Sequence, residues 1–314
     1  MTCASHVRGP ATDRFRHEAA LYRGLDDMVG TVLPFVREGL ALSEQMMVAM
    51  PPDRNRAVTE ALGADAAQVT FVDMLEIGAN PARIIPEWRR FVDQAGGRPI
   101  RGVGEPVWVG RRDVEIDECA LHESLLNLAF DEGPAWRLMC PYDVDALSAR
   151  AVEEALRTHP VVGSTAAPTI SYQGHGHAFS AFTEPLPAPP ANAAELPFGV
   201  DDLVGVRDVV RRLSLQAGVG ADVAEDLVLA AHELATNSTH HGGGRGVLSA
   251  WGEVGAFVVE VRDAGTIADP LVGRELSSLL SESGRGVWMA NQLCDLAQVR
   301  STATGTVVRL FAWL

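Results

Sequence analysis

Apolar and polar residues follow two different periods in the first half of the chain. Apolar residues spaced three to four apart predict helices at residues 25–40, 81–94, 117–130 and 145–158. Short unbroken apolar runs predict buried strands at residues 45–50, 69–72, 100–103 and 136–140. Because strands and helices alternate, the pattern indicates a parallel sheet with helices on both faces, which is a doubly wound α/β domain.

The order of the elements changes in the second half. Helical spacing covers residues 201–218, 221–239 and 286–295. Strand patterns cover residues 246–250, 256–262, 297–301 and 306–313. Two helices followed by hairpin-like strands indicate a mixed sheet with helices packed on one face, which is an α/β sandwich.

Residues 163–198 separate the two halves. They contain six of the 18 prolines, and Glu184 and Glu195 are their only charged residues. Such a segment is stiff and extended, so we expect a linker with one short ordered piece around residues 170–182. Its GHGH sequence at residues 174–177 is interpreted as a loop, because no further metal ligands accompany the two histidines. The expected division is a first domain at residues 1–163, a Pro-rich linker at 164–197 and a second domain at 198–314.

The composition excludes several classes of function. All 26 basic residues are arginine, so the chain can form neither a Walker A phosphate loop nor a Schiff base on a lysine. A formal net charge of −15 argues against direct binding of nucleic acid. No apolar run approaches the roughly 18 residues of a membrane span, the N-terminus lacks a signal-peptide core, and the four cysteines form no CxxC pair. We therefore expect a cytoplasmic protein with reduced thiols and no membrane contact.

Two polar residues on the helix predicted at residues 221–239 suit a nucleotide site. Glu233 and Asn237 are four residues apart, so they lie on the same helix face. Mg²⁺ prefers oxygen ligands, and the amide oxygen of Asn237 together with phosphate oxygens would supply them. Glu233 is placed to accept a proton from an attacking hydroxyl group.

The later strands and turns add the groups that a nucleotide needs. Asp263 ends a strand and offers a fixed carboxylate to the exocyclic amine of adenine, while Gly265 would let the backbone approach the base. Gly284 and Gly286 open a helix whose N–H groups would face the triphosphate. Thr306 follows Gly305 in the last strand and completes the set.

In this order the motifs resemble the Bergerat-type ATP site of GHKL proteins: an N box HELATNSTHH, a G1 box DAG, a G2 box GRG and a late GT. With about 18 residues between G1 and G2, the domain at residues 198–314 resembles the anti-sigma-factor serine kinases. The resemblance implies ATP and Mg²⁺ as cofactors, with Asn237 as the metal-binding residue and Asp263 as the adenine-binding residue. It also implies that Glu233 is the general base for phosphorylation of a serine of an antagonist protein, and that the other partner is a sigma factor.

The chain departs from that family at Ile267, where the G1 box commonly has a second glycine, and its lid at residues 266–283 is not Gly-rich. Three alternatives therefore stay open beside a serine kinase. One is a switch that binds ATP without catalysis, and another is an interaction module that works without ATP. The third is an atypical sensor histidine kinase, which shares this ATP domain but needs an acceptor histidine on a dimerising helix, where this chain has its Pro-rich segment.

Residues 15–162 resemble the MEDS sensory domain of methanogens and methylotrophs, on segments such as GEPVW, ECALHESLLNLAF and ALRTHPVV. The resemblance implies a sensor of an unknown small molecule, with a RecA-like fold that lacks the phosphate loop. Candidates for lining its ligand pocket are His17, Tyr22, Glu105, Trp108, His122 and Glu123. Cys119, His122 and Cys140 offer three soft metal ligands without a fourth, so they are not counted as a metal site.

Together the two resemblances indicate a sensor-linked anti-sigma regulatory factor that acts in signal transduction and transcription regulation. Its expected partners are proteins, namely a sigma factor and an antagonist. The oligomeric state is left open, with a homodimer among the options.

Overall fold

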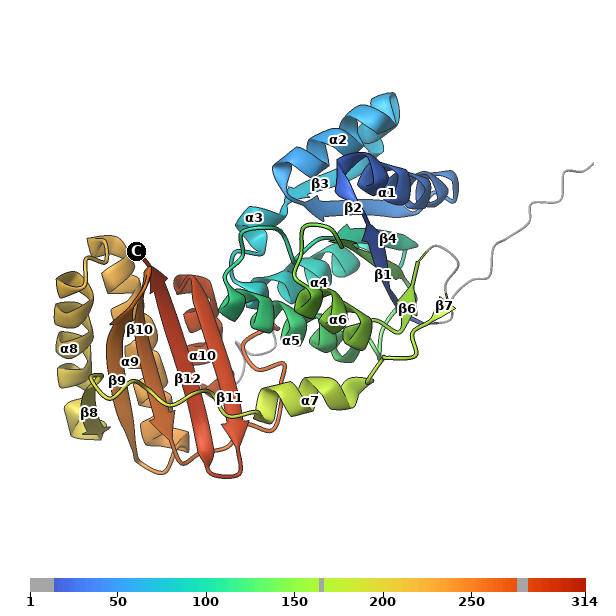
Figure 1. Ribbon diagram of the computed structural model, residues 1–314. Helices are drawn as coiled ribbons and strands as arrows, with labels where there is room; N and C mark the ends of the chain where they lie inside the picture. Colours follow the sequence, from blue (N-terminus) through green and yellow to red (C-terminus); the bar gives the residue numbers. More distant parts are fainter. Residues whose placement is uncertain (1–13, 164–166, 276–281) are drawn as a thin grey trace, which may run out of the picture.

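The computed structural model describes residues 14–163, 167–275 and 282–314. These residues form two sheets, which define a parallel-sheet domain built on β1 to β7 and an antiparallel-sheet domain built on β8 to β12 (Figure 1). No helix among them combines the length and apolar character that crossing a lipid bilayer requires.

The first sheet has the strand order β3-β2-β4-β5-β1-β6-β7. Among these strands β7 alone runs antiparallel to the others, and it pairs with β6. Its strands are β1 Arg16–Tyr22, β2 Gln45–Met50, β3 Val69–Asp73, β4 Ile100–Gly104, β5 Arg137–Asp143, β6 Val161–Val162 and β7 Ala167–Pro168. Apolar side chains of both sheet faces are buried, as expected for parallel strands between two helical layers.

Helices cover both faces of this sheet. On one face α1 and α2 pack over Val48 and Met139, and on the other α4, α5 and α6 pack over Ala49 and Leu138. The helices of this domain are α1 Gly24–Ala41, α2 Pro52–Leu62, α3 Met74–Ile77, α4 Ile84–Ala95, α5 Asp113–Ala129 and α6 Ala149–Thr158, with 3₁₀ turns at Gly63–Gln68 and Pro81–Arg83. The domain is thus doubly wound, as the sequence predicts.

The second sheet is antiparallel, with the order β11-β12-β10-β9-β8. Its strands are β8 Ala194–Gly199, β9 Arg245–Glu253, β10 Ala256–Asp263, β11 Leu296–Thr302 and β12 Gly305–Trp313. Three helices cover one face, namely α8 Leu203–Gln216, α9 Ala221–His241 and α10 Glu282–Leu293 (Figure 1). Alternate strand residues such as Val259 and Leu310 pack under these helices, so this domain is the predicted two-layer α/β sandwich.

Several elements escape the sequence pattern, among them β1, α2 and β8. β1 begins with the polar residues Arg16, His17 and Glu18, of which the last two are buried. α2 has only Val58 and Leu62 buried, too few to show a helical stripe. β8 begins inside the expected linker and ends in the predicted second domain, and its proline is tolerated because β8 is the edge strand of the sheet.

The GHGH segment lies at the start of a helix, α7 His175–Thr183, so it is not a loop. His177 pairs there with Glu154 of α6, at 3.1 Å. Ala178 packs into the core of the parallel-sheet domain, whereas Phe182 packs into that of the antiparallel-sheet domain. The segment therefore bridges the two cores.

Buried polar contacts join the two domains at α5. Glu118 of α5 accepts a hydrogen bond from Arg300 of β11 at 2.5 Å and one from Arg274, which precedes α10, at 3.2 Å. Gln298 donates to the same carboxylate at 3.3 Å. All four side chains are buried, so this ion cluster is shielded from solvent.

A second joint holds the C-terminal end of α10. Arg83 donates to the carbonyl oxygens of Asn291, Gln292 and Cys294 at 2.7–2.9 Å, which satisfies carbonyl groups of the last helical turn. Asn80 donates to the carbonyl oxygen of Asn291 as well, at 3.1 Å. The start of the 3₁₀ turn before α4 and the end of α10 are therefore fixed to each other.

Candidate functional site

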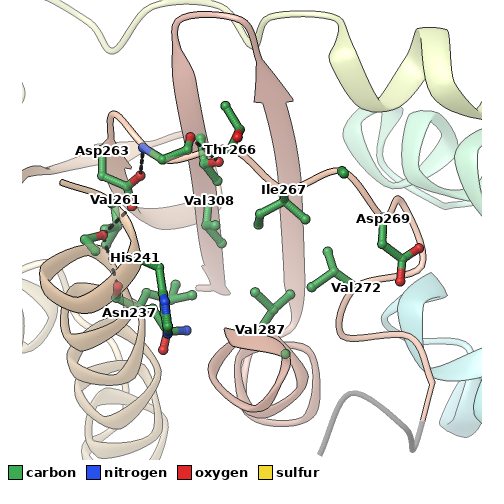
Figure 2. Close-up of a pocket in the computed structure, with 17 residues that line it drawn as sticks. Asn237, His241, Val261, Asp263, Thr266, Ile267, Asp269, Val272, Val287 and Val308 are labelled. Carbon is green, nitrogen blue, oxygen red and sulfur yellow. Dashed lines mark hydrogen bonds between the residues drawn. The ribbon is translucent and has the colours of Figure 1, made fainter. Parts of the chain in front are cut away.

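A cavity of about 520 Å³ lies where α9, the end of β10 and the start of α10 meet. Its size is in the range of small-molecule sites. Five of the sequence-predicted site residues line it: Asn237, Asp263, Gly265, Gly284 and Thr306. Figure 2 shows Asp263 and Asn237 on the same side, one from the end of β10 and the other from α9.

Asp263 is held rigidly at the end of β10. Its Oδ2 accepts a hydrogen bond from the Ser238 hydroxyl at 2.5 Å, and its Oδ1 accepts one from the Gly265 backbone N–H at 2.7 Å. Each oxygen keeps further acceptor capacity, because an ionised carboxylate has about four lone-pair sites. The fixed carboxylate can therefore accept a hydrogen bond from a ligand N–H group.

The loop after Asp263 is tied to the last two strands. Thr306 donates from its hydroxyl to the Gly265 carbonyl oxygen at 2.9 Å, and the Ile267 N–H donates to the Ser301 hydroxyl at 2.7 Å. The two hydroxyl groups lie 3.2 Å apart. The segment that would contact a bound base is thus preorganised.

Apolar side chains line much of the rest of the cavity. They are Leu234, Val261, Ile267, Val272, Val287 and Val308, and each belongs to the core of this domain or packs against it. Ile267, Val272 and Val287 lie together, away from Asp263 and Asn237 (Figure 2). Such a wall suits the flat, weakly polar ring of a base.

Two predicted residues, Glu233 and Gly286, are not among the described residues that line the cavity. Glu233 lies one turn before Asn237 and is half-buried. Gly286 contacts α9 instead, since a Cβ at this position would overlap the side-chain amide of Asn237 and lie 3.4 Å from the carbonyl oxygen of Glu233. The structure therefore gives Gly286 a packing function, and its contact with phosphates stays a prediction.

Changing Gly286 to alanine tests this packing. The added methyl group must displace the side-chain amide of Asn237, which is the group expected to hold Mg²⁺. We expect the Gly286→Ala variant to bind Mg-ATP at least tenfold more weakly in calorimetric titration. Gly205→Ala in α8 is the control, because a Cβ there meets nothing within 4 Å; equal affinities of the two variants would contradict the packing function.

Sequence reasoning missed Ser238, which is buried and orients Asp263. The signal was present, because Ser238 continues the buried stripe of Leu227, Ala231 and Leu234, where a polar side chain needs a partner. Residues 276–281 of the predicted lid at residues 266–283 lie outside the described chain.

The six candidates of the parallel-sheet domain do not line one cavity. His17 and Glu123 contact each other at 2.9 Å, while Tyr22 donates to Glu105 at 2.8 Å in a separate cluster. Trp108 packs its ring under the Arg111 guanidinium at 3.5 Å. The candidates that contact one another therefore form two separate polar clusters inside the core, one with His17 and Glu123 and the other with Tyr22 and Glu105.

Glu105 predicts a pH dependence of stability. Burial raises the pKa of its carboxyl to about 8, against the attraction of Arg54 at 3.3 Å and the Tyr22 hydrogen bond, with Asp53 and Asp143 adding repulsion. The folded protein thus keeps a proton that the unfolded chain has lost above pH 4.5, so stability falls as the pH rises from there to about 8.

When the pH rises from 6 to 7.5, the titration of Glu105 should lower the free energy of unfolding by about 2 kcal/mol. Urea titrations of the protein and of Glu105→Gln at both pH values measure the effect, because glutamine keeps the shape and cannot ionise. The loss should disappear in Glu105→Gln, and the same loss in both proteins would show that other groups cause it.

Comparison with known families agrees with this architecture. Residues 16–160 match the family described as MEDS, the methanogen/methylotroph, DcmR sensory domain. Residues 196–312 match the family described as the histidine kinase-like ATPase domain. The chain therefore carries a MEDS domain followed by a histidine kinase-like ATPase domain, and the cavity lies in the latter.

Solved structures and curated proteins add little to these matches. The RsbU and RsbW domains of Rv1364c from Mycobacterium tuberculosis align with 22% identity and a TM-score of 0.30, over 40% of this chain and 33% of that one. The SiaB-SiaC complex from Pseudomonas aeruginosa aligns with 14% identity and a TM-score of 0.29, over 37% of this chain and 88% of that one. Among curated proteins, none matches this sequence.

Proposed function

We propose that this chain, a MEDS domain joined to a histidine kinase-like ATPase domain, is a sensor-linked regulator of the anti-sigma type that binds Mg-ATP. The observation that carries the proposal is the cavity, which gathers the fixed carboxylate of Asp263, the amide of Asn237 and the start of α10 in the ATPase domain. The partners we propose are a sigma factor and an antagonist protein, as in the serine kinases that the motifs resemble.

Each group at the cavity has a defined task in this proposal. Asp263 accepts a hydrogen bond from the adenine amine, and the apolar wall with Ile267 contacts the base. The isoleucine that replaces the second G1 glycine therefore supplies contact area. The oxygen of Asn237 would hold Mg²⁺, which neutralises charge on the phosphates.

Phosphoryl transfer, if the chain is a serine kinase, would use Glu233. The hydroxyl of a partner serine attacks the γ-phosphorus, Glu233 takes its proton, and the bond to the β-phosphate oxygen breaks to release ADP. Glu233 lies on the same helix face as Asn237, one turn earlier, which suits this task.

The link to the sensory domain rests on the two joints at α5 and Arg83. Glu118 holds Arg274 in the segment between Asp263 and α10, and Arg83 holds the last turn of α10. The segment after Asp263 and helix α10 both line the cavity, and each of them therefore contacts the MEDS domain. A ligand that shifts α5 or the turn before α4 would act directly on the nucleotide site.

Calorimetric titration of the whole chain with Mg-ATP tests the binding. We expect a dissociation constant in the micromolar range, about −8 kcal/mol, that weakens when Mg²⁺ is chelated. An absence of heat with folded protein would overturn the proposal in favour of an interaction module.

Incubation with γ-labelled ATP and a candidate antagonist then tests catalysis. Acid-stable label on the antagonist supports a serine kinase, whereas acid-labile label on the chain itself supports a histidine kinase. Binding without label supports a switch that uses ATP as a ligand only.

A further inference from the structure

Four potential metal ligands converge in the core of the MEDS domain. They are His17 of β1, Glu123 of α5, Cys140 of β5 and His159 after α6, and their ligand atoms all lie within 4.8 Å of one another. All four side chains are essentially inaccessible to solvent. The cluster is separate from the nucleotide cavity, since none of the four lines it.

The hydrogen bonds around the cluster fix which atoms point inward. Asn127 donates from its amide nitrogen to the carbonyl oxygens of Thr158 and Glu123, so its oxygen faces His17 and accepts from Nδ1 at 3.2 Å. His159 likewise donates from Nδ1 to the Ala155 carbonyl oxygen at 2.8 Å. Both imidazoles therefore present the lone pair of Nε2 to the cluster.

The other two ligands are oriented in the same way. Tyr142 donates to Oε1 of Glu123 at 3.0 Å, which leaves Oε2 directed at the histidines and at Cys140 Sγ. Within the part of the chain that the structure describes, Nε2 of His159 has no hydrogen-bond partner. Outer hydrogen bonds that fix histidine tautomers and carboxylate oxygens are typical of protein metal sites.

The distances suit one tetrahedral ion. Nε2 of His17 lies 3.3 Å from Cys140 Sγ, and Oε2 of Glu123 lies 3.4 Å from Nε2 of His159 and 3.7 Å from Cys140 Sγ. Ligands bound to Zn²⁺ at 2.0–2.3 Å in tetrahedral geometry are about 3.3–3.6 Å apart. The 2.9 Å separation between His17 and Glu123 has to widen, and the widest separations in the cluster, which reach up to 4.8 Å, have to narrow when the ion binds.

We propose that His17, Glu123, Cys140 and His159 bind one transition-metal ion of the Zn²⁺ class inside the MEDS domain. Three lone pairs and a thiol that meet in a dry core repel one another unless a proton or a cation lies between them, and a cation satisfies all four at once. Imidazole and thiolate ligands favour Zn²⁺, Co²⁺ or Fe²⁺ over Mg²⁺ and Ca²⁺. Four protein ligands in a closed site are typical of structural zinc.

The test uses the full chain and needs no nucleotide. Purified protein should contain about one zinc ion per chain, and refolding with Co²⁺ should produce thiolate-to-cobalt charge-transfer absorption. Cys140→Ser should lose that absorption. Cys119→Ser should keep it, because Cys119 is an equally buried thiol whose Sγ donates to the Pro106 carbonyl oxygen instead.

X-ray absorption at the zinc edge of the unmodified chain covers the case in which Cys140→Ser fails to fold. The expected first shell is one sulfur and three nitrogen or oxygen atoms. A shell without sulfur overturns the proposal. So does folded protein that holds less than about a tenth of an ion per chain and gives no charge-transfer band, because the cluster is then a proton-sharing network.

Discussion

Replacing Asp263 by asparagine is expected to weaken the binding of Mg-ATP by about 10- to 100-fold. The carboxylate loses its charge, and hydrogen bonds to charged groups contribute about 1.5–3 kcal/mol. The amide that replaces it must also turn an N–H₂ group toward Ser238 or Gly265, both of which donate to Asp263. Calorimetric titration of the variant beside the unmodified chain measures the loss.

Asp269→Asn is the matched control for this prediction. Asp269 lines the same cavity with the same charge, but it is exposed, and its carboxylate accepts from the nearby Leu271 N–H. Its loss should change the affinity by less than about threefold, because exposed charges interact weakly across water. If both variants bind Mg-ATP equally well, Asp263 does not contact the base and the orientation proposed for the nucleotide is wrong.

The residues of the proposed nucleotide site could be grouped from the sequence because they lie in short motifs, and five of them line one cavity. Asn237 belongs to one helix, and Asp263 and Gly265 belong to one turn, so local spacing alone places them. The fold then needs only the antiparallel pairing of β10 and β12 to bring Thr306 beside Asp263. Residues that belong to local motifs can thus be expected to converge before the fold is known, whereas their chemistry stays a prediction.

The metal cluster could not be found in that way. His17 and His159 come from elements that are 142 positions apart in sequence, and no spacing rule connects them. The sequence analysis grouped Cys119, His122 and Cys140, but the structure places only Cys140 in the cluster, since Cys119 contacts Pro106. The polar residues at the start of β1 include His17 of the cluster, and they are also the reason why the apolar pattern does not predict this strand.

The joints between the domains were equally hidden. Glu118 lies on a helix that looks amphipathic, and nothing local shows that it pairs with Arg274 and Arg300, which are 156 and 182 positions away. A buried carboxylate between two arginines requires tertiary structure to be recognised. It also provides the largest stability effect that we expect.

Replacing Glu118 by alanine should lower the free energy of unfolding by about 3–5 kcal/mol, the usual cost of leaving a buried charge without its partner. Here two guanidinium groups, those of Arg274 and Arg300, lose the same carboxylate. Removing Arg300 as well should restore part of the stability, since one uncompensated charge disappears. Urea denaturation of the single and double variants measures both effects.

Asp117→Ala provides the control from the neighbouring position of α5. Asp117 also pairs with an arginine, Arg150, but the Arg150 side chain is exposed and Asp117 is only partly buried, so its loss should cost less than about 1 kcal/mol. Equal destabilisation by the two changes would mean that the cluster at Glu118 is solvated in solution.

The same pair of variants also tests whether α5 connects the sensory domain to the nucleotide. Arg274 precedes α10, whose start borders the cavity, so freeing it from Glu118 should change the affinity for Mg-ATP at temperatures where the variant is folded. Asp117→Ala leaves Arg274 in place and should bind as the unmodified chain does. An unchanged affinity in Glu118→Ala would show that the ion cluster only holds the domains together, because a coupling element must bias the site that it contacts.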